Sequence, residues 1–407
     1  MTGALAHIRV LDLSRILAGP WASQILADLG AEVIKVERPG AGDDTRGWGP
    51  PYLKDEAGET LADSAYYLCA NRNKKSVTID FTTPDGQRMV RELAARSDIL
   101  IENFKVGGLR KLGLDYESLK AVNPRLIYCS ITGFGQTGPY APRAGYDYLI
   151  QAMGGLMSVT GRGDDEPGGG PLKVGVAVTD LMTGLYAATA VLAALAHRDV
   201  TGVGQHIDLA LLDVQVACLA NQSMNYLYSG AQPPRLGNAH PNVVPYQDFP
   251  TADGHMILAI GNDGQFARLC AALGEPGWAE DERFRTNTAR VSNRNLLAGM
   301  IRERTPARTT GAWIGILEAA NVPCGPINGL AEVFADPQVQ ARGMRISLPH
   351  PEAGPIPLVA NPIRLSETPV SYRNAPPRLG EHTAEVLGGL LDLDGEALAS
   401  LSKAGVI

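Results

Sequence analysis

Short apolar runs alternate with amphipathic stretches along the first part of the chain, and this alternation predicts a parallel α/β fold. Residues 8–13 (IRVLDL) and 32–37 (EVIKVE) are short, apolar and rich in β-branched residues, as buried strands require. Between them, Pro20 can open a helix that Gly30 ends. A strand, a helix and a second strand in this order predict a right-handed parallel crossover.

The same alternation continues to about residue 135. Strands are expected at 76–81 (SVTIDF), 98–104 (DILIENF) and 126–134 (LIYCSITGF). Thr83 precedes Pro84 and is a candidate N-cap for the helix that follows, and a second helix is expected at 109–122. Strands that alternate with helices in this way are typical of a parallel sheet.

The second half of the chain changes character near residue 226. A helix is expected at 146–157, and a strand followed by one long helix at 205–227. The turn-rich segment 231–245 (AQPPRLGNAHPNVVP) follows, and Asp253-Gly254 predicts a hairpin. Further helices are expected at 265–273, 290–303 and 310–320. The pattern divides the chain into 1–225, a large α/β domain; 226–325, a small α+β domain; and 326–407, a return to the large domain.

The most apolar run is 173–199, and it contains one carboxylate, Asp180. No residue from Leu181 to Ala196 is charged, and small residues surround leucines near helical spacing, which predicts a helix packed on all sides. This stretch is shorter than the roughly 20 residues that span a bilayer, so a buried core helix is favoured. Asp180 is then either a structural acid, favoured by the helix dipole by about 0.3–1 kcal/mol, or a functional one.

Composition and charge narrow the class of protein. Of 407 residues, 45% are apolar and 19% charged, which is typical of a soluble globular protein, and the net charge of −7 argues against a nucleic-acid partner. The five cysteines are scattered without a C-x-x-C, so neither a disulfide framework nor a zinc site is indicated, and the histidines show no metal-binding spacing. The N-terminal residues lack a signal pattern, so a cytoplasmic location is expected.

Several residues lie where an open α/β sheet binds ligands, at the ends of strands. Arg38 follows the second strand and could meet a phosphate, and Asn103-Phe104 ends the strand at 98–104. The cluster Arg72 to Lys75 (RNKK) precedes the third strand, where a solvated charge cluster is the alternative. Glu37 resembles the ribose-binding acid of a dinucleotide fold, but the preceding turn lacks G-x-G-x-x-G, which argues against NAD.

The motifs taken together resemble the class III coenzyme A transferases, the family of formyl-CoA transferase and carnitine CoA-transferase. The resemblance is carried, in chain order, by RVLDLSRILAGP, LGAEVIKVERPGAGDDTR, NRNKKSVTIDF, ILIENF, NPRLIYCSITGFGQTGPY, RAGYDYL, VAVTDLMTGLY, VPCGPIN and PPRLGEHT. Within the family the likeness is greatest to the succinyl-CoA:glutarate type, in NRNKKS, CSITGFGQTGP, QVACLANQSMNYL and VPYQDFPTADG.

This resemblance implies an interlaced homodimer, each chain having a Rossmann-like large domain and a small domain. It implies acyl-CoA and a small carboxylic acid as substrates, no permanently bound cofactor, no metal, no nucleic acid and no membrane partner. Asp180 matches the family's acid and is implied to be the nucleophile, forming an aspartyl anhydride and an aspartyl-CoA thioester. The implied donor is succinyl-CoA, and the implied acceptor is a short dicarboxylate such as glutarate.

Other site residues are implied by position. The candidate CoA contacts are Arg38, Arg72, Lys75, Ile79, Asn103, Phe104, Lys105, Arg110 and Lys111, with Leu17, Ala18, Tyr146 and Asp147 near the thioester. The chain departs from formyl-CoA transferase in three places. Leu17 replaces a Gln, HPNVVPY (240–246) replaces a Gly-rich lid, and Lys111 or the preceding Arg110 replaces an Arg at the phosphate contact.

Two alternatives to a transferase remain at this point. An α-methylacyl-CoA racemase has a similar N-terminal half but an A-G-H-D segment, where this chain has Ala144–Asp147 (AGYD). Tyr146, with a pKa near 10 when unperturbed, is a poor base near pH 7, which disfavours the racemase. A non-catalytic CoA-binding protein is disfavoured because Asp180 is present.

Overall fold

The computed structural model describes residues 3–407, which divide into two compact units. The first unit comprises the chain up to Leu156, Val174–Ser223 and Pro337–Ile407; the second comprises Met157–Lys173 and Met224–Asp336. These units differ from the expected segments in two places, because residues 157–173 group with the second unit and that unit extends past residue 325. The C-terminal segment groups with the first unit, so that unit is built from both ends of the chain.

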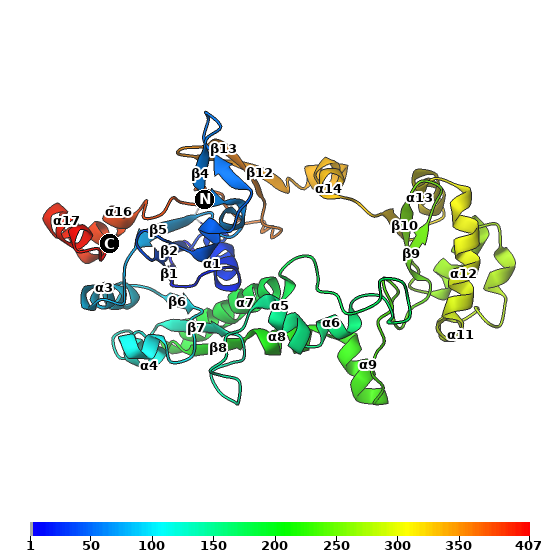
Figure 1. The fold of residues 1–407 in the computed structure, drawn as a ribbon, viewed down its shortest axis with the longest axis horizontal. Helices are drawn as coiled ribbons and strands as arrows, with labels where there is room; N and C mark the ends of the chain where they lie inside the picture. Colours follow the sequence, from blue (N-terminus) through cyan, green and yellow to red (C-terminus); the bar gives the residue numbers. More distant parts are fainter. Residues whose placement is uncertain (1–2) are drawn as a thin grey trace. The chain divides into compact units, whose positions relative to one another are not determined.

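Within residues 3–407, a six-stranded parallel sheet forms the centre of the first unit (Figure 1). In spatial order its strands are β5 (Lys74–Thr78), β2 (Glu32–Glu37), β1 (Arg9–Asp12), β6 (Ile99–Glu102), β7 (Ile127–Thr132) and β8 (His206–Ala210). Each neighbouring pair is parallel, which confirms the predicted parallel α/β fold. This is the strand order of the doubly wound Rossmann fold, whose ligands bind where the order reverses, here between β1 and β6.

Helices cover both faces of the sheet because successive strand residues point in opposite directions. Val10 packs into the core on one face and Leu11 into the core on the other. Helices α1 (Ala18–Asp28) and α7 (Val178–Thr201) contribute to the first core, and α3 (Pro84–Ala95), α4 (Tyr116–Lys120) and α16 (Thr383–Leu391) to the second (Figure 1). Each apolar run of the sequence is therefore buried on both sides, as a parallel sheet requires.

Helix α7 is 24 residues long, longer than its uncharged stretch. By length and composition alone it could cross a membrane, a test that core helices also pass. One side of it, including Ala187 and Val191, is buried in the core with α1, so the predicted core helix is confirmed there. The expectation of packing on all sides is wrong for this chain alone, because Leu185 and Leu192 are exposed on the other side.

Helices α1 and α7 cross closely at Gly184. A Cβ at this position would lie 2.8 Å from the Ala18 carbonyl oxygen and 3.0 Å from Trp21 Cβ, so a larger residue would push the two helices apart. The crossing lies in the first turn of α1, at Ala18 and Trp21, and within the first two turns of α7. It therefore brings the two helix N-termini close to each other.

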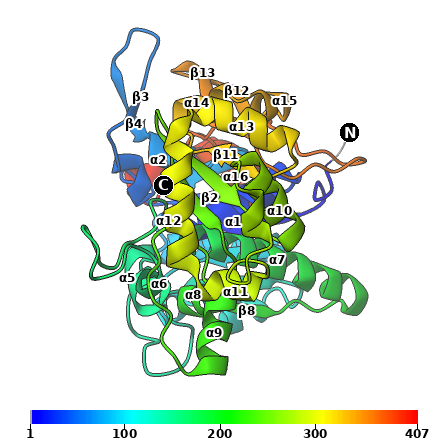
Figure 2. The same cartoon turned by 90° about the vertical axis from the view of Figure 1, so that its right-hand side faces the viewer.

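The second unit contains a small antiparallel sheet of β9 (Tyr246–Pro250), β10 (His255–Ala259) and β11 (Cys324–Pro326) (Figure 2). Asp253-Gly254 lies in the turn between β9 and β10, which confirms the predicted hairpin. The core of this unit is formed with α10 (Asp263–Ala272), α11 (Asn287–Ser292), α12 (Arg294–Arg304) and α13 (Thr310–Ala319). The three helices expected in this region are thus present, the middle one in two parts.

The remaining elements are short. The strand pairs β3 (Tyr52–Lys54) with β4 (Thr60–Ser64) and β12 (Arg345–His350) with β13 (Gly354–Val359) are antiparallel. The remaining helices are α2 (Ala65–Leu68), α5 (Asp147–Met153), α6 (Leu156–Val159), α8 (Leu211–Cys218), α9 (Asn221–Ser229), α14 (Leu330–Ala335), α15 (Pro337–Ala341) and α17 (Gly395–Lys403). Four 3₁₀ turns among the described residues are Asp44–Gly47, Leu109–Leu112, Pro276–Ala279 and Thr305–Ala307.

Four elements differ from the sequence-based expectations. The helix expected at 146–157 ends at Met153 and is followed by the separate helix α6. The third strand, β5, begins at Lys74, because the Lys74 side chain is buried against Asp12 and extends the strand. The helix expected at 109–122 is a 3₁₀ turn and the separate helix α4, since Gly113 between them has a left-handed φ of 67°. The long helix expected within 205–227 is broken in the same way at Ala220, whose φ is 47°.

Candidate active site

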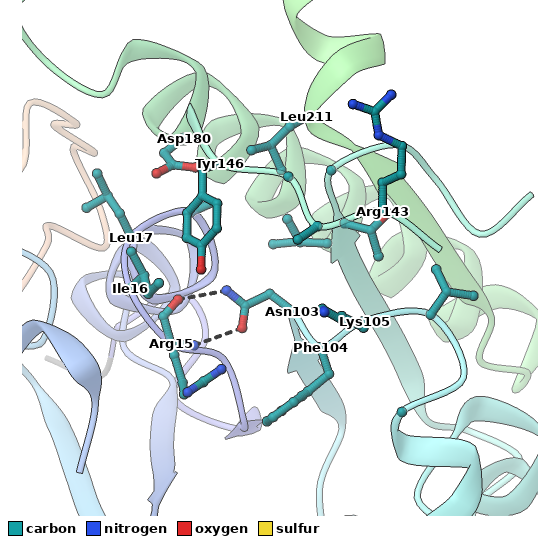
Figure 3. Close-up of a pocket in the computed structure, with 18 of the residues that line it drawn as sticks. Arg15, Ile16, Leu17, Asn103, Phe104, Lys105, Arg143, Tyr146, Asp180 and Leu211 are labelled. Atoms are coloured by element: carbon teal, nitrogen blue, oxygen red, sulfur yellow. Dashed lines mark hydrogen bonds between the residues drawn. The ribbon is translucent and has the colours of Figure 1, made fainter. Parts of the chain in front are cut away.

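A cavity of about 410 Å³ opens where β1 and β6 end, at the switch point of the sheet (Figure 3). The loop after β1 contributes Arg15, Ile16 and Leu17, and the loop after β6 contributes Asn103, Phe104 and Lys105. The end of β7 adds Thr132 and Gly133, and the first turn of α7 adds Asp180. The fold therefore places the cavity where open α/β sheets bind their ligands.

Asp180 is held by a neighbouring carboxylate that caps helix α7. The N-cap residue of α7, Ala177, has no side-chain acceptor, and Asp147 from α5 takes that role. One oxygen of Asp147 accepts the Thr179 N–H at 2.8 Å and the Asp180 N–H at 3.3 Å, and the other accepts the Gln151 amide at 2.6 Å. Asp147 thus fixes the backbone of Asp180 and leaves the Asp180 side chain facing the cavity.

The Asp180 carboxylate has no neutralising partner. Burial raises its pKa to about 7, and the negative charge of Asp147 contributes in the same direction. Among the described residues no cation forms an ion pair with it. A purely structural acid at a helix N-terminus would have a lowered pKa, so the raised value favours the functional interpretation. Near neutral pH about half of the molecules carry an ionised, poorly solvated carboxylate at this point.

The start of helix α1 forms a further part of the cavity wall. Leu17 is its N-cap residue and provides no side-chain acceptor, and both Leu17 and Ala18 line the cavity. The first N–H groups of any helix lack partners within the helix, and their partial positive charge attracts anions. The close crossing at Gly184 holds this helix start beside that of α7. An oxyanion that forms on a group attached to Asp180 would therefore have backbone donors nearby.

Aromatic and polar side chains complete the cavity (Figure 3). Tyr146 is 61% exposed and lies beside Asp180. The Asn103 side chain accepts the Arg15 N–H at 2.9 Å and donates to the Arg15 carbonyl at 2.7 Å, so it fixes the loop after β1. Phe104 lies under the Arg15 guanidinium, 5.5 Å from the ring centre, while Lys105 is exposed at the rim.

The structure brings some of the predicted site residues together in the cavity and places the others elsewhere. The predicted residues that line the cavity are Leu17, Ala18, Asn103, Phe104, Lys105, Tyr146 and Asp180. The predicted residues that do not line it are Arg38, Arg72, Lys75, Ile79, Arg110, Lys111 and Asp147. Arg110 lines an adjoining cavity of about 300 Å³ that shares Phe104 and Lys105 with the first. Arg38 and Lys111 are exposed cations outside both cavities.

Three of the predicted CoA contacts have other roles. Arg72 forms a buried ion pair with Asp28 at 2.5 Å. Lys75 pairs with Glu32 at 3.0 Å and with Glu385 at 2.8 Å. Ile79 is 1% exposed and packs into the apolar core. The RNKK segment therefore stabilises the fold, and we do not assign these three residues to CoA.

Glu37 is likewise not free for a ribose. Its two carboxylate oxygens accept the Arg46 guanidinium at 2.9 and 2.8 Å, and the side chain is buried. Ser76 donates a further hydrogen bond at 2.6 Å. With no glycine-rich turn and an occupied acid, a nicotinamide dinucleotide has no ribose contact here.

Sequence patterns missed several cavity residues. Arg15, Ile16 and Arg143 line the cavity. Tyr66 lies near Asp180: burial raises the pKa of Tyr66 to about 12, and the charge of Asp180 is a second, smaller cause of this rise. Arg15 and Ile16 follow the first strand directly, so the rule for carboxyl ends of strands could have found them. Arg143 lies in an irregular segment and Tyr66 in the short helix α2, and neither position carries such a signal.

Comparisons with known proteins agree along the whole chain. A model of CoA-transferase family III matches residues 5–383. A succinate–glutarate CoA-transferase of Agrobacterium fabrum is 55% identical over 393 residues, which cover 97% of each chain. A succinyl-CoA:glutarate CoA-transferase of Homo sapiens is 45% identical over 403 residues, covering 99% of this chain and 90% of that protein.

A solved structure supports the same relationship. The crystal structure of a CAIB/BAIF family protein from Brucella suis has a TM-score of 0.84 and 52% sequence identity, covering 96% of this chain and 100% of that chain. The family model, the relatives and the solved structure all cover most of the chain, and the residues that the family model matches include the cavity and Asp180. The chain therefore belongs to CoA-transferase family III and is a class III CoA-transferase.

Proposed function

We propose that this enzyme moves CoA from succinyl-CoA to a short dicarboxylate such as glutarate, through covalent intermediates on Asp180. The Agrobacterium relative is a succinate–glutarate CoA-transferase and the human relative a succinyl-CoA:glutarate CoA-transferase, which supports this choice of substrates. The observation that carries the mechanism is the Asp180 carboxylate, which faces a cavity without a counterion and with a pKa near 7. A carboxylate that is ionised yet poorly solvated is suited to attack a carbonyl carbon.

The first half of the reaction would load CoA onto Asp180. An Asp180 oxygen attacks the thioester carbon of succinyl-CoA, the C–S bond breaks, and CoA leaves as a thiolate. The product is a mixed anhydride of Asp180 and succinate. The thiolate then attacks the Asp180 carbonyl carbon, the C–O bond to succinate breaks, and free succinate departs. Asp180 is left as a thioester of CoA.

The second half would run in the opposite direction with a new acid. The acceptor carboxylate attacks the Asp180 thioester carbon and displaces the CoA thiolate, which gives a second anhydride. The thiolate attacks the acyl carbon of the acceptor, releasing the new acyl-CoA and the Asp180 carboxylate. No proton is gained or lost overall. Water would hydrolyse either anhydride, and the apolar side chains of Ile16, Leu17, Ile131 and Leu211 in the cavity wall oppose its entry.

Each attack would pass through a tetrahedral oxyanion. We assign its stabilisation to the backbone N–H groups of Leu17 and Ala18, at the start of α1. One preorganised donor is worth roughly 3 kcal/mol in other acyl-transfer enzymes. Since the donors belong to the main chain, the Leu17 side chain that replaces glutamine does not remove them.

CoA itself would extend from this point toward exposed cations. Lys105 at the rim of the cavity and Arg110 in the adjoining cavity are suitable for its phosphates. Tyr146 and Phe104 offer flat apolar surfaces for the pantetheine chain. CoA enters and leaves as a substrate, so no permanently bound cofactor is invoked.

We also propose that two chains form the interlaced homodimer typical of the family. The exposed side of α7 carries Leu185, Tyr186 and Leu192 in helical spacing, and an apolar stripe of this kind needs a partner. Sedimentation equilibrium should give twice the mass of the chain, and Leu185→Glu with Leu192→Glu should weaken the dimer. A wild-type protein that sediments as a single chain would contradict the proposal.

Asp180→Asn tests both the nucleophile and its charge. We expect CoA transfer to fall by more than about a thousandfold, because an amide cannot form the anhydride. We expect stability to rise, because folding raises the Asp180 pKa from about 3.8 to about 7. Between these values the unfolded state binds fewer protons, so the wild type loses stability as the pH increases and the variant does not. The advantage of the variant should grow between pH 4 and 7, reach at most about 4 kcal/mol and stay level above pH 7.

Thermal melts across pH 4 to 8 measure this difference, with Asp28→Asn as a buried-carboxylate control outside the cavity. An Asp180→Asn variant that keeps its activity, or that is destabilised equally at every pH, would refute the assignment.

Asp147→Asn should shift the pH dependence of the reaction. Removal of the Asp147 charge takes away one cause of the raised Asp180 pKa, so the acid limb of kcat/KM should move to lower pH. The asparagine oxygen can still accept the Thr179 and Asp180 N–H groups, and only the hydrogen bond from the Gln151 amide is lost, because the asparagine NH2 group cannot accept it. Initial rates from pH 5 to 9 measure the limb. A limb that stays in place or moves upward would show that Asp147 does not act on Asp180 by its charge.

A panel of acids tests the substrates. With succinyl-CoA as donor, we expect glutarate and other short dicarboxylates to be used with higher kcat/KM than formate, oxalate or carnitine. Product acyl-CoA is measured by chromatography. A preference for a monocarboxylate or for carnitine would overturn the dicarboxylate assignment and leave the transferase intact. Solvent deuterium entering the acyl α-carbon without any acceptor acid would instead indicate racemase chemistry.

A further inference from the structure

Ile16 has an unusual backbone conformation at the wall of the active-site cavity. Its φ is 71°, in the left-handed region, which a β-branched residue adopts only under strain. The other non-glycine residues with positive φ in the described chain, Asn73, Ala220, Asn321 and Asp392, are not β-branched and do not line this cavity. Strain of this kind persists only where surrounding contacts impose it.

The contact that imposes it is made by Asp43. The Ile16 N–H donates to both carboxylate oxygens of Asp43, at 3.2 Å each. Asp43 is itself fixed, because one oxygen accepts the Thr45 N–H at 3.0 Å and the Thr45 hydroxyl at 2.8 Å. The other oxygen accepts the Lys35 ammonium at 2.8 Å, and both charged side chains of this ion pair are fully buried.

The same ion pair also holds the residue two positions earlier. The Lys35 ammonium donates to the Ser14 carbonyl at 2.9 Å. Between these points, the Asn103 side chain forms hydrogen bonds with both backbone groups of Arg15 (Figure 3). The backbone of residues 14 to 16 is thus held by the side chains of Lys35, Asn103 and Asp43, and of these three only Asn103 lines the cavity.

The conformation of Ile16 decides where the next amide points. Leu17 follows as the N-cap of α1, with φ −134° and ψ −56°, and lines the cavity together with Ala18. If Ile16 relaxed to a negative φ, the Ile16–Leu17 peptide would turn, because everything beyond the Ile16 Cα rotates with that angle. The Leu17 N–H would then no longer have its present direction beside Asp180.

We propose that Asp43 is a positioning residue: it holds Ile16 in the left-handed conformation and so aims the Leu17 and Ala18 N–H groups at the reacting carbonyl. The inference rests on the oxyanion role given to those two amides under the proposed function. Asp43 does not touch the substrate, because it is buried behind Ile16 and does not line the cavity. It acts on the reaction through backbone geometry alone.

The test exploits the fact that glycine adopts a positive φ without strain. Asp43→Asn should lower kcat by about tenfold to a hundredfold, since a misaimed oxyanion donor costs that order of rate, while KM for succinyl-CoA changes by less than about threefold. Ile16→Gly alone removes an apolar side chain from the cavity wall, so its own kcat is measured as the reference for the double variant. The double variant, Asp43→Asn with Ile16→Gly, should reach a kcat close to that of Ile16→Gly although its melting temperature stays low.

This recovery separates positioning from simple stabilisation. A merely structural Asp43 would give a double variant no more active than Asp43→Asn, and that result would overturn the proposal. Asp28→Asn is the matched control, because it also removes one charge of a buried ion pair but outside the cavity. It should lower the melting temperature without a comparable loss of kcat, and Ile16→Gly should not raise its kcat.

A milder variant covers the case in which Asp43→Asn does not fold. Thr45→Val removes one hydroxyl that donates to Asp43 and keeps the ion pair with Lys35. It should lower kcat by a smaller factor that Ile16→Gly again restores, and no restoration would overturn the proposal. All rates are compared with the acid that the wild type uses best, so an error in the dicarboxylate assignment leaves this test readable. If Asp180→Asn kept its activity, the proposed mechanism would fail independently of these ratios.

Discussion

The active site depends on the close crossing of α1 and α7. Gly184 lets the Ala18 carbonyl approach to a distance that no side chain would permit, and the two helix N-termini consequently share one cavity. One N-terminus carries the Asp180 carboxylate and the other offers backbone N–H groups without helical partners. Nucleophile and oxyanion donors are therefore fixed on rigid helices, which is how acyl transfer gains preorganised stabilisation.

Charged side chains near this crossing occur in two opposite arrangements, one neutralised by an ion pair and one not. Behind the loop after β1, Lys35 and Asp43 are fully buried and neutralise each other. At the cavity, Asp180 is left without a cation and beside the like charge of Asp147. The first arrangement stabilises an unfavourable backbone conformation, and the second keeps a carboxylate reactive near neutral pH. Both arrangements make the folded protein less stable than a different set of residues at these positions could have made it.

Much of the fold followed from the sequence because its strands are strongly patterned. The runs at 8–13 and 32–37, the N-cap Thr83 and the hairpin at Asp253-Gly254 lie where patterns placed them. The sequence patterns gave wrong bounds for helices and strands where the conformation or pairing of a single residue determines the bounds. The left-handed residues Gly113 and Ala220 broke expected helices, and the buried pairing of Lys74 lengthened β5.

The residues of the active site could likewise be predicted from the sequence only in part. Asp180 stood out as an acid in an apolar run, but its role came from family resemblance rather than from the pattern. Basic residues near strand ends could not be sorted from sequence, because Arg72 and Lys75 form ion pairs with residues far away in the chain. The strain at Ile16 left no trace in the sequence, since it arises from a tertiary contact with Asp43.

The central claim is that Asp180 becomes covalently linked to CoA, and peptide mass spectrometry tests it most directly. The enzyme is incubated with succinyl-CoA without an acceptor acid, reduced with borohydride, digested and analysed at the peptide that carries Asp180. We expect a reduced side chain at Asp180 that appears only when succinyl-CoA is present. An enzyme preparation that transfers CoA once an acceptor acid is added, yet shows an unmodified Asp180 after incubation with succinyl-CoA alone and reduction, would contradict it.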